Sequence, residues 1–114
     1  MIIMGLDNFW KKSFDSEEIF DLEFDPPLKL CGGLFSAHGS DSFRGKVYAE
    51  FIEEVSGFSI YRDLNNEEVH KISEKLNNYK EFKESDEISL KEFEDLKRMF
   101  KAYAESDAVL IAWY

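Results

Sequence analysis

Apolar residues recur every three or four positions in three segments of the chain, a spacing that places them on one face of a helix. The first segment begins near Ser42 and carries Val47, Phe51 and Val55 on its apolar face. Gly57 follows, where helices commonly end in a left-handed residue. We therefore predict a helix that begins near Ser42 and ends before Gly57.

The two other helical segments have clear signals at their beginnings. One covers about residues 67–79, and either Asn65 or Asn66 can cap it. The next begins with a capping box, in which Ser89 and Glu92 each accept a hydrogen bond from the other's backbone N–H. Its apolar face is predicted to comprise Leu90, Phe93, Leu96, Phe100 and Tyr103.

Shorter apolar segments predict strands. Residues 19–24 alternate apolar and acidic side chains, and residues 109–113 form a continuous apolar segment. Further short candidates are residues 2–4, 28–31 and 58–61. The pattern predicts a single α+β domain over residues 1–114, with three helices packed on a small mixed or antiparallel β-sheet.

Composition agrees with a folded domain, because 44% of the 114 residues are hydrophobic and eleven are phenylalanine. The longest apolar run, residues 108–114, is far shorter than a membrane span, so we expect no membrane partner. The first residues do not resemble a signal peptide, and a single cysteine suits a reducing compartment. These features predict a cytoplasmic protein.

The net charge of −10 is unevenly distributed, since residues 15–25 hold six acidic and no basic residues. A strongly acidic surface repels phosphates, so we expect no binding to nucleic acid. It attracts basic proteins, although solubility alone also accounts for such a charge.

The glycine-rich segment between Gly32 and Gly45 contains four of the six glycines. It does not match a phosphate-binding loop, because five residues separate Gly39 from Gly45 and Val47 stands where that motif needs a hydroxyl. A looser anion site at the beginning of the first helix remains open. Its predicted ligand-binding residues are Gly39, Ser40, Arg44 and Lys46.

Helical geometry separates the two cations of this segment. If both are helical, Arg44 projects onto the apolar face and Lys46 onto the opposite side. We therefore predict that Arg44 forms a structural tie to the loop or to the acidic residues, and that Lys46 pairs with Glu50.

Cys31 and His38 are the weak candidates for catalysis, as a thiol nucleophile and its base. A lone cysteine is more simply a small buried hydrophobe, so we favour a protein that is not an enzyme. Together with Asp41 these residues lack the paired spacing of a zinc site, and we predict neither a metal nor a cofactor.

Aromatic residues gather near both ends of the sequence, where a small core cannot enclose all of them. Leftover aromatic surface and an exposed strand edge favour association, including a homodimer. The residues are Phe9, Trp10, Phe14, Trp113 and Tyr114.

Three strings of the sequence carry a resemblance. Met4-Gly-Leu-Asp-Asn-Phe-Trp10, Cys31-Gly-Gly-Leu-Phe-Ser36 and Ser42-Phe-Arg-Gly-Lys-Val-Tyr48 resemble uncharacterised small acidic proteins of archaea and phages. The resemblance implies a prokaryotic or viral setting and brings no activity, cofactor or catalytic residue.

Three functions follow from these observations. The favoured one is an acidic binding or interaction domain whose 31–46 loop contacts a protein partner or a small anion. The first alternative is a small enzyme or nucleotide-binding protein that uses Cys31, His38 and Arg44. The second is an acidic inhibitor that mimics nucleic acid and occupies a basic protein.

Overall fold

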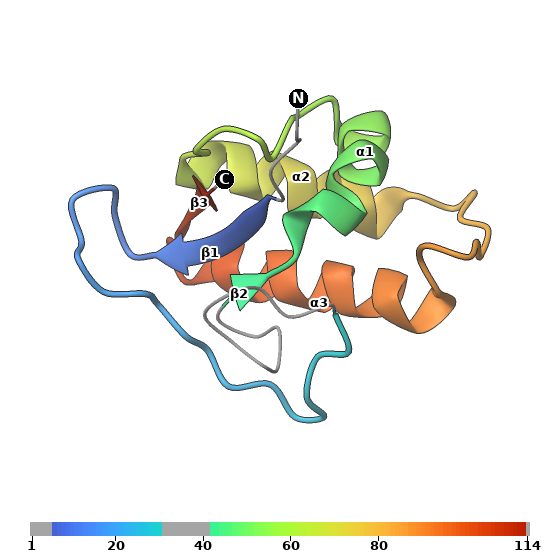
Figure 1. Ribbon diagram of the computed structural model, residues 1–114, viewed down its shortest axis with the longest axis horizontal. Coiled ribbons are helices and arrows are strands. Elements are labelled where there is room, and N and C mark those ends of the chain that lie inside the picture. Colours follow the sequence, from blue (N-terminus) through green and yellow to red (C-terminus); the bar gives the residue numbers. More distant parts are fainter. Residues whose placement is uncertain (1–5, 31–41, 114) are drawn as a thin grey trace, which may run out of the picture.

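Three antiparallel strands and three helices make up the fold (Figure 1). The computed structural model describes residues 6–30 and 42–113. The strands pair in the order β2-β1-β3, so β1 is central. In chain order the elements are β1 (Asp7–Lys11), β2 (Ser42–Phe43), α1 (Gly45–Ser56), α2 (Asn66–Asn78), α3 (Leu90–Glu105) and β3 (Val109–Trp113).

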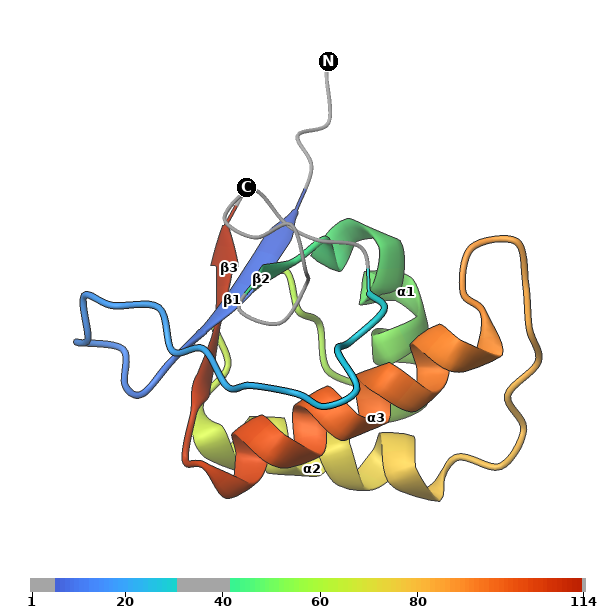
Figure 2. The ribbon, with the colours of Figure 1, turned by 90° about the horizontal axis from the view of Figure 1, so that it is seen from below.

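The core forms where the central strand meets α3. Trp10 projects from β1 and stacks on Tyr103 of α3, with ring centroids 4.3 Å apart and planes 4° from parallel. The edge of Phe100 meets the same indole at 5.3 Å. Helices α2 and α3 pack against each other, and α1 packs on α2 (Figures 1 and 2). The predicted α+β fold of three helices on a small antiparallel sheet is confirmed.

The helix ends follow the sequence signals closely. Asn65 caps α2 in a capping box with Glu68, and Ser89 caps α3 in the predicted box with Glu92. Gly57 ends α1 in the left-handed region, with φ of 82°. The prediction for Leu90 was wrong, because its side chain is 53% exposed.

The prediction for the beginning of the first helix was also wrong. Ser42 and Phe43 form β2, in which Ser42 pairs with Phe9 of β1, and α1 begins only at Gly45. Arg44 is therefore the N-cap residue and does not project onto the apolar face of the helix. Pairing with the central strand overrides the helical pattern at these residues.

Of the predicted strands, residues 109–113 are confirmed as β3, and β1 was missed. The sequence Asp-Asn-Phe-Trp-Lys does not predict a strand, because Asp, Asn and Lys are normally depleted in strands. Residues 28–30 and 58–61 are not strands, and the candidate at residues 2–4 lies outside the described residues.

Residues 19–24 form no strand, so the strand predicted there was wrong, although the Phe20 N–H donates to the Trp10 carbonyl of β1 at 2.7 Å. Their alternation is still real, because Phe20, Leu22 and Phe24 pack on the core while the acidic residues between them are exposed. The Leu22 N–H donates to the Tyr103 hydroxyl at 3.0 Å instead of to a neighbouring strand. The alternation of apolar and acidic residues therefore reflects burial of one side of this segment against α3.

Asp95 anchors the coil of residues 12–30 to α3 (Figure 2). This carboxylate is fully buried and accepts hydrogen bonds from the Lys29 backbone N–H at 2.8 Å and from Arg98 and Lys91 at 2.8 and 3.1 Å. Arg98 also donates to the Pro26 carbonyl at 2.6 Å. Burial on its own raises the pKa of Asp95, but the three hydrogen bonds outweigh it and hold the pKa below its ordinary value.

Replacing Asp95 by asparagine should lower the free energy of unfolding by about 2 kcal/mol, since the Lys29 N–H, Arg98 and Lys91 lose a charged hydrogen-bond acceptor. The loss stays below that of a fully buried ion pair, because Lys91 and Arg98 are 47% and 31% exposed and remain solvated. A carboxyl whose pKa is lowered by folding stabilises the protein above about pH 4 and loses that effect as pH falls further. Urea unfolding followed by Trp10 fluorescence at pH 7 and pH 3 measures both effects.

The matched control is Glu94→Gln, which removes an exposed carboxylate one position earlier on the same helix. We expect it to change the free energy of unfolding by less than about 0.5 kcal/mol. An Asp95→Asn protein as stable as the wild type, with the same loss of stability in acid, contradicts the anchoring role.

Candidate functional site

Three buried polar side chains surround the junction between the sheet and α1. Asp7, Asn8 and Ser42 are at most 2% exposed. Asn8 pairs in register with Phe43, and Phe9 pairs with Ser42, so the short strand β2 brings the beginning of α1 beside β1. The junction lies directly after the predicted glycine-rich site, which makes it the first place to test that prediction.

Asn8 fixes the position of α1 through Gly45. The Asn8 side chain donates from Nδ2 to the carbonyls of Ile60 and Ile111, at 2.9 and 3.2 Å. Its Oδ1 lies so close to Gly45 that a Cβ atom there would be 1.7 Å away. Gly45 is therefore required for this close approach of helix and strand.

Arg44 turns toward the sheet. Its Nη1 lies 3.6 Å from Oδ1 of the buried Asp7, while the Arg44 side chain stays 40% exposed. Arg44 is thus tied to a carboxylate, as expected, although to one on β1 and not in the acidic segment. The Lys46 backbone N–H donates to the Leu6 carbonyl at 3.0 Å, and that of Val47 to Arg44 at 3.1 Å.

This geometry weakens the case for an anion at the beginning of α1. Two N–H groups of the first turn already have partners within the chain, and a buried carboxylate neighbours Arg44. Of the other predicted site residues, Cys31, His38, Gly39 and Ser40 lie outside the described residues, as does Asp41. Arg44 and Lys46 are the predicted site residues that the structure describes.

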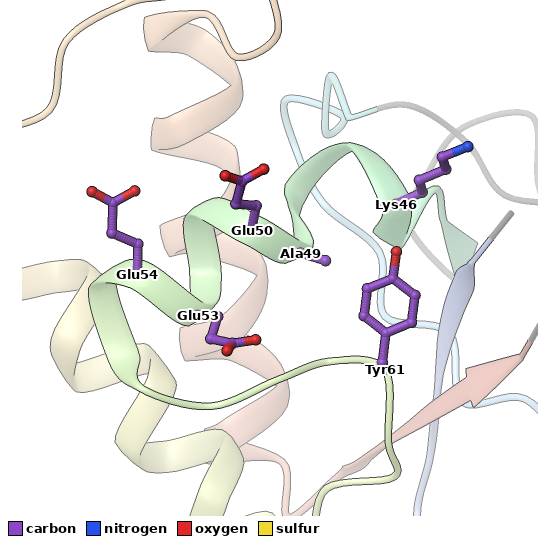
Figure 3. A pocket seen from close by; sticks show the side chains of 6 residues that line it. All are labelled: Lys46, Ala49, Glu50, Glu53, Glu54 and Tyr61. Atoms are coloured by element: carbon purple, nitrogen blue, oxygen red, sulfur yellow. The ribbon is translucent and has the colours of Figure 1, made fainter. Parts of the chain in front are cut away.

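An open hollow of about 800 Å³ lies between α1 and the connection that follows it. We call it the α1 hollow (Figure 3). Tyr61 rises from the connection toward the first turn of the helix, and Glu53 lies on the side of α1 that faces the connection. Glu50 and Glu54 extend from the other side of the helix, and the Lys46 side chain points away from them. The lining residues are Lys46, Ala49, Glu50, Glu53, Glu54 and Tyr61.

The carboxylates of this hollow have no cationic partner among the described residues. Glu50, Glu53 and Glu54 take part in none of the six salt bridges found there, and the predicted Lys46–Glu50 pair does not form. Glu50 also has a like charge three and four positions further along the helix, which is unfavourable. No ion pair of the described part of the chain therefore compensates the negative charge at this surface.

The charges of α1 are also reversed relative to its macrodipole. Glu53 and Glu54 lie in the last turn, where backbone carbonyls already carry partial negative charge, and Lys46 lies in the first turn. Helix α2 has the favourable arrangement, with Glu67 and Glu68 first and Lys75 last. Such local conflicts are expected where a surface serves a function other than stability.

A second hollow of about 520 Å³, which we call the β3 hollow, shares Tyr61 with the first. Two exposed aromatic residues border it, since Tyr61 is 40% and Trp113 is 53% exposed. Its lining residues are Tyr61, Arg62, Asp63, Ala112 and Trp113.

The outer edge of β3 is covered beside this hollow. Leu64 and Leu110 exchange two backbone hydrogen bonds of 2.9 and 3.0 Å, and the Ala112 N–H donates to Asp63 at 2.9 Å. An exposed strand edge was one reason to expect a homodimer. On this edge, however, the backbone groups of Leu110 and the N–H of Ala112 already have hydrogen-bond partners. The homodimer stays a prediction.

The sequence analysis did not single out the carboxylates of α1. Its acidic positions were visible as the polar side of the helix, but nothing in the pattern distinguished them from an ordinary solvated face. Tyr61 carried no signal at all, because its position depends on the connection folding back along the helix.

Within residues 6–30 and 42–113, no group of three or more histidine, cysteine or carboxylate side chains is placed to hold a metal ion. The same residues include no helix with the length and apolar character needed to cross a bilayer.

Comparison with known proteins adds no family: no family model, no curated protein and no solved structure matches the chain significantly. The resemblance to small archaeal and phage proteins therefore stays a prediction.

Replacing Gly45 by alanine should destabilise the protein by roughly 2 kcal/mol, because the new methyl group would overlap the Asn8 side chain. Removing that side chain creates the space, so Asn8→Ala combined with Gly45→Ala should lose less than the sum of the two single variants. Chemical unfolding of all four proteins measures this coupling.

Gly57→Ala is the matched control, because no atom lies within 4 Å of the added methyl group and only the φ of 82° opposes it. We expect a loss of about 1 kcal/mol that adds independently to Asn8→Ala. If the stability losses of Gly45→Ala and Asn8→Ala also add independently in the double variant, the proposed close approach of Gly45 and Asn8 is contradicted.

Proposed function

We propose that this protein is a non-enzymatic interaction domain that binds a basic protein partner through the α1 hollow. The observation that carries the proposal is the set of uncompensated carboxylates on α1, two of them placed against the helix dipole. A cationic partner supplies the compensation that no salt bridge within residues 6–30 and 42–113 provides. The net charge of −10 favours the same partner through long-range attraction.

The alternatives receive less support from the geometry. Arg44 is engaged by Asp7, which favours a structural role over a role in catalysis or nucleotide binding. Mimicry of nucleic acid needs a continuous acidic surface, and lysines and arginines interrupt it on α2 and α3. A small anion at Lys46 is repelled by the three carboxylates that line the same hollow.

Replacing Glu53 and Glu54 together by glutamine should weaken binding and stabilise the fold. We expect the free energy of unfolding to rise by about 0.5–1 kcal/mol, because the last turn of α1 loses two unfavourable charges. Affinity for a ten-residue peptide of alternating arginine and serine should fall about fivefold, as two exposed charge pairs are lost. Isothermal titration calorimetry and urea unfolding measure the two effects.

Glu17→Gln with Glu18→Gln is the matched control, since it removes two exposed charges from the coil after β1. It should leave the peptide affinity within twofold and the stability within about 0.5 kcal/mol. The wild-type affinity should also fall when salt is raised from 50 to 500 mM. Equal weakening by both double variants would show that total charge, not this hollow, attracts the peptide.

A further inference from the structure

The α1 hollow and the β3 hollow meet at Tyr61, which lines both. Tyr61 borders the α1 hollow with Glu53 and the β3 hollow with Trp113 and Asp63. A basic segment bound in the α1 hollow therefore continues onto two exposed aromatic rings. Exposed aromatic residues beside a charged hollow are typical of the anchor points of protein interfaces.

We propose that an arginine of the basic partner enters the β3 hollow, where its guanidinium stacks on Trp113 or Tyr61 and pairs with Asp63. This inference rests on the proposed function, because it names the residue type that the same surface selects. Arginine fits better than lysine, since a planar and weakly hydrated guanidinium stacks on aromatic faces and a compact ammonium does so less well.

The Trp113 ring is held in place before any partner arrives. The Trp113 backbone pairs with Asp7 in the sheet, and its indole lies against Phe9, with ring centroids 6.4 Å apart. Phe9 itself is only 5% exposed. A large side chain that is already oriented loses little conformational entropy on binding.

The charges at this hollow also favour a cation. Asp63 uses Oδ1 to accept the Ala112 N–H and has no salt bridge among the described residues, so its second oxygen faces no competing cation there. Arg62 is already neutralised, because its guanidinium lies 2.6 Å from a Glu68 carboxylate oxygen. The hydrogen bond from Arg62 holds the pKa of Glu68 below its ordinary value, so this pair stays ionised at neutral pH.

Two peptides of equal charge test the proposal: ten residues of alternating arginine and serine, and ten of alternating lysine and serine. The wild-type protein should bind the arginine peptide about fivefold more tightly at 150 mM salt, because stacking adds to the shared electrostatic attraction. Trp113→Ala should abolish that preference and leave the affinity for the lysine peptide within twofold. Glu53→Gln with Glu54→Gln should weaken both peptides equally and keep the preference.

Leu90→Ala is the matched control, because it removes an equally exposed apolar side chain from α3. It should keep the arginine preference. Trp113→Leu retains apolar bulk without an aromatic face and should lose the preference as fully as Trp113→Ala. Emission from the buried Trp10 shows that each variant is folded.

The outcomes separate the two proposals. Equal binding of both peptides by the wild type, unchanged in Trp113→Ala, overturns the arginine site and leaves the acidic interaction surface in place. Failure of both peptides to bind the wild type even at 50 mM salt overturns the interaction surface and the arginine site together. A wild-type dimer in sedimentation that Trp113→Ala converts to a monomer overturns the arginine site, because a second copy then covers the β3 hollow.

Discussion

The stacking of Trp10 on Tyr103 is the interaction on which the rest of the structure depends. It joins the central strand to α3, and the same tyrosine hydroxyl accepts the backbone N–H of Leu22. One pair of rings thereby connects the sheet, a helix and the long coil. Both rings are fully buried, so losing either leaves a large cavity that its neighbours cannot fill.

The position of α1 follows from the central strand as well. Asn8 donates to the Ile60 carbonyl in the connection after α1 and to the Ile111 carbonyl in β3, and Gly45 lets the helix begin beside it. Because the helix is fixed at this end by buried contacts, its outer face is free to carry charges that do not stabilise it. The glutamates of the α1 hollow occupy that face. Stability and the proposed binding surface are thus carried by opposite sides of one helix.

Local signals in the sequence predicted the helix ends well and the strands poorly. Capping depends on neighbours within one turn, so Asn65 and Ser89 could be recognised directly. A strand depends on partners distant in the chain. Strand β1 can contain Asp7 and Asn8 because Asp7 forms an ion pair with Arg44 and the Asn8 side chain donates to two backbone carbonyls. None of these partners is adjacent to them in sequence. The candidate site was harder to predict than the strands, because Tyr61 lies beside α1 only in the folded chain.

The sequence by itself determined the class of the fold, the three helices, the last strand and the acidic character of the surface. Periodicity and capping encode these features over a few residues. The tertiary structure alone decided that residues 19–24 pack on α3 without forming a strand, and that Ser42 joins the sheet instead of a helix. It also decided that Tyr61 and Trp113 border one hollow. Each of these depends on contacts across many residues, which no local pattern of apolar and polar positions records.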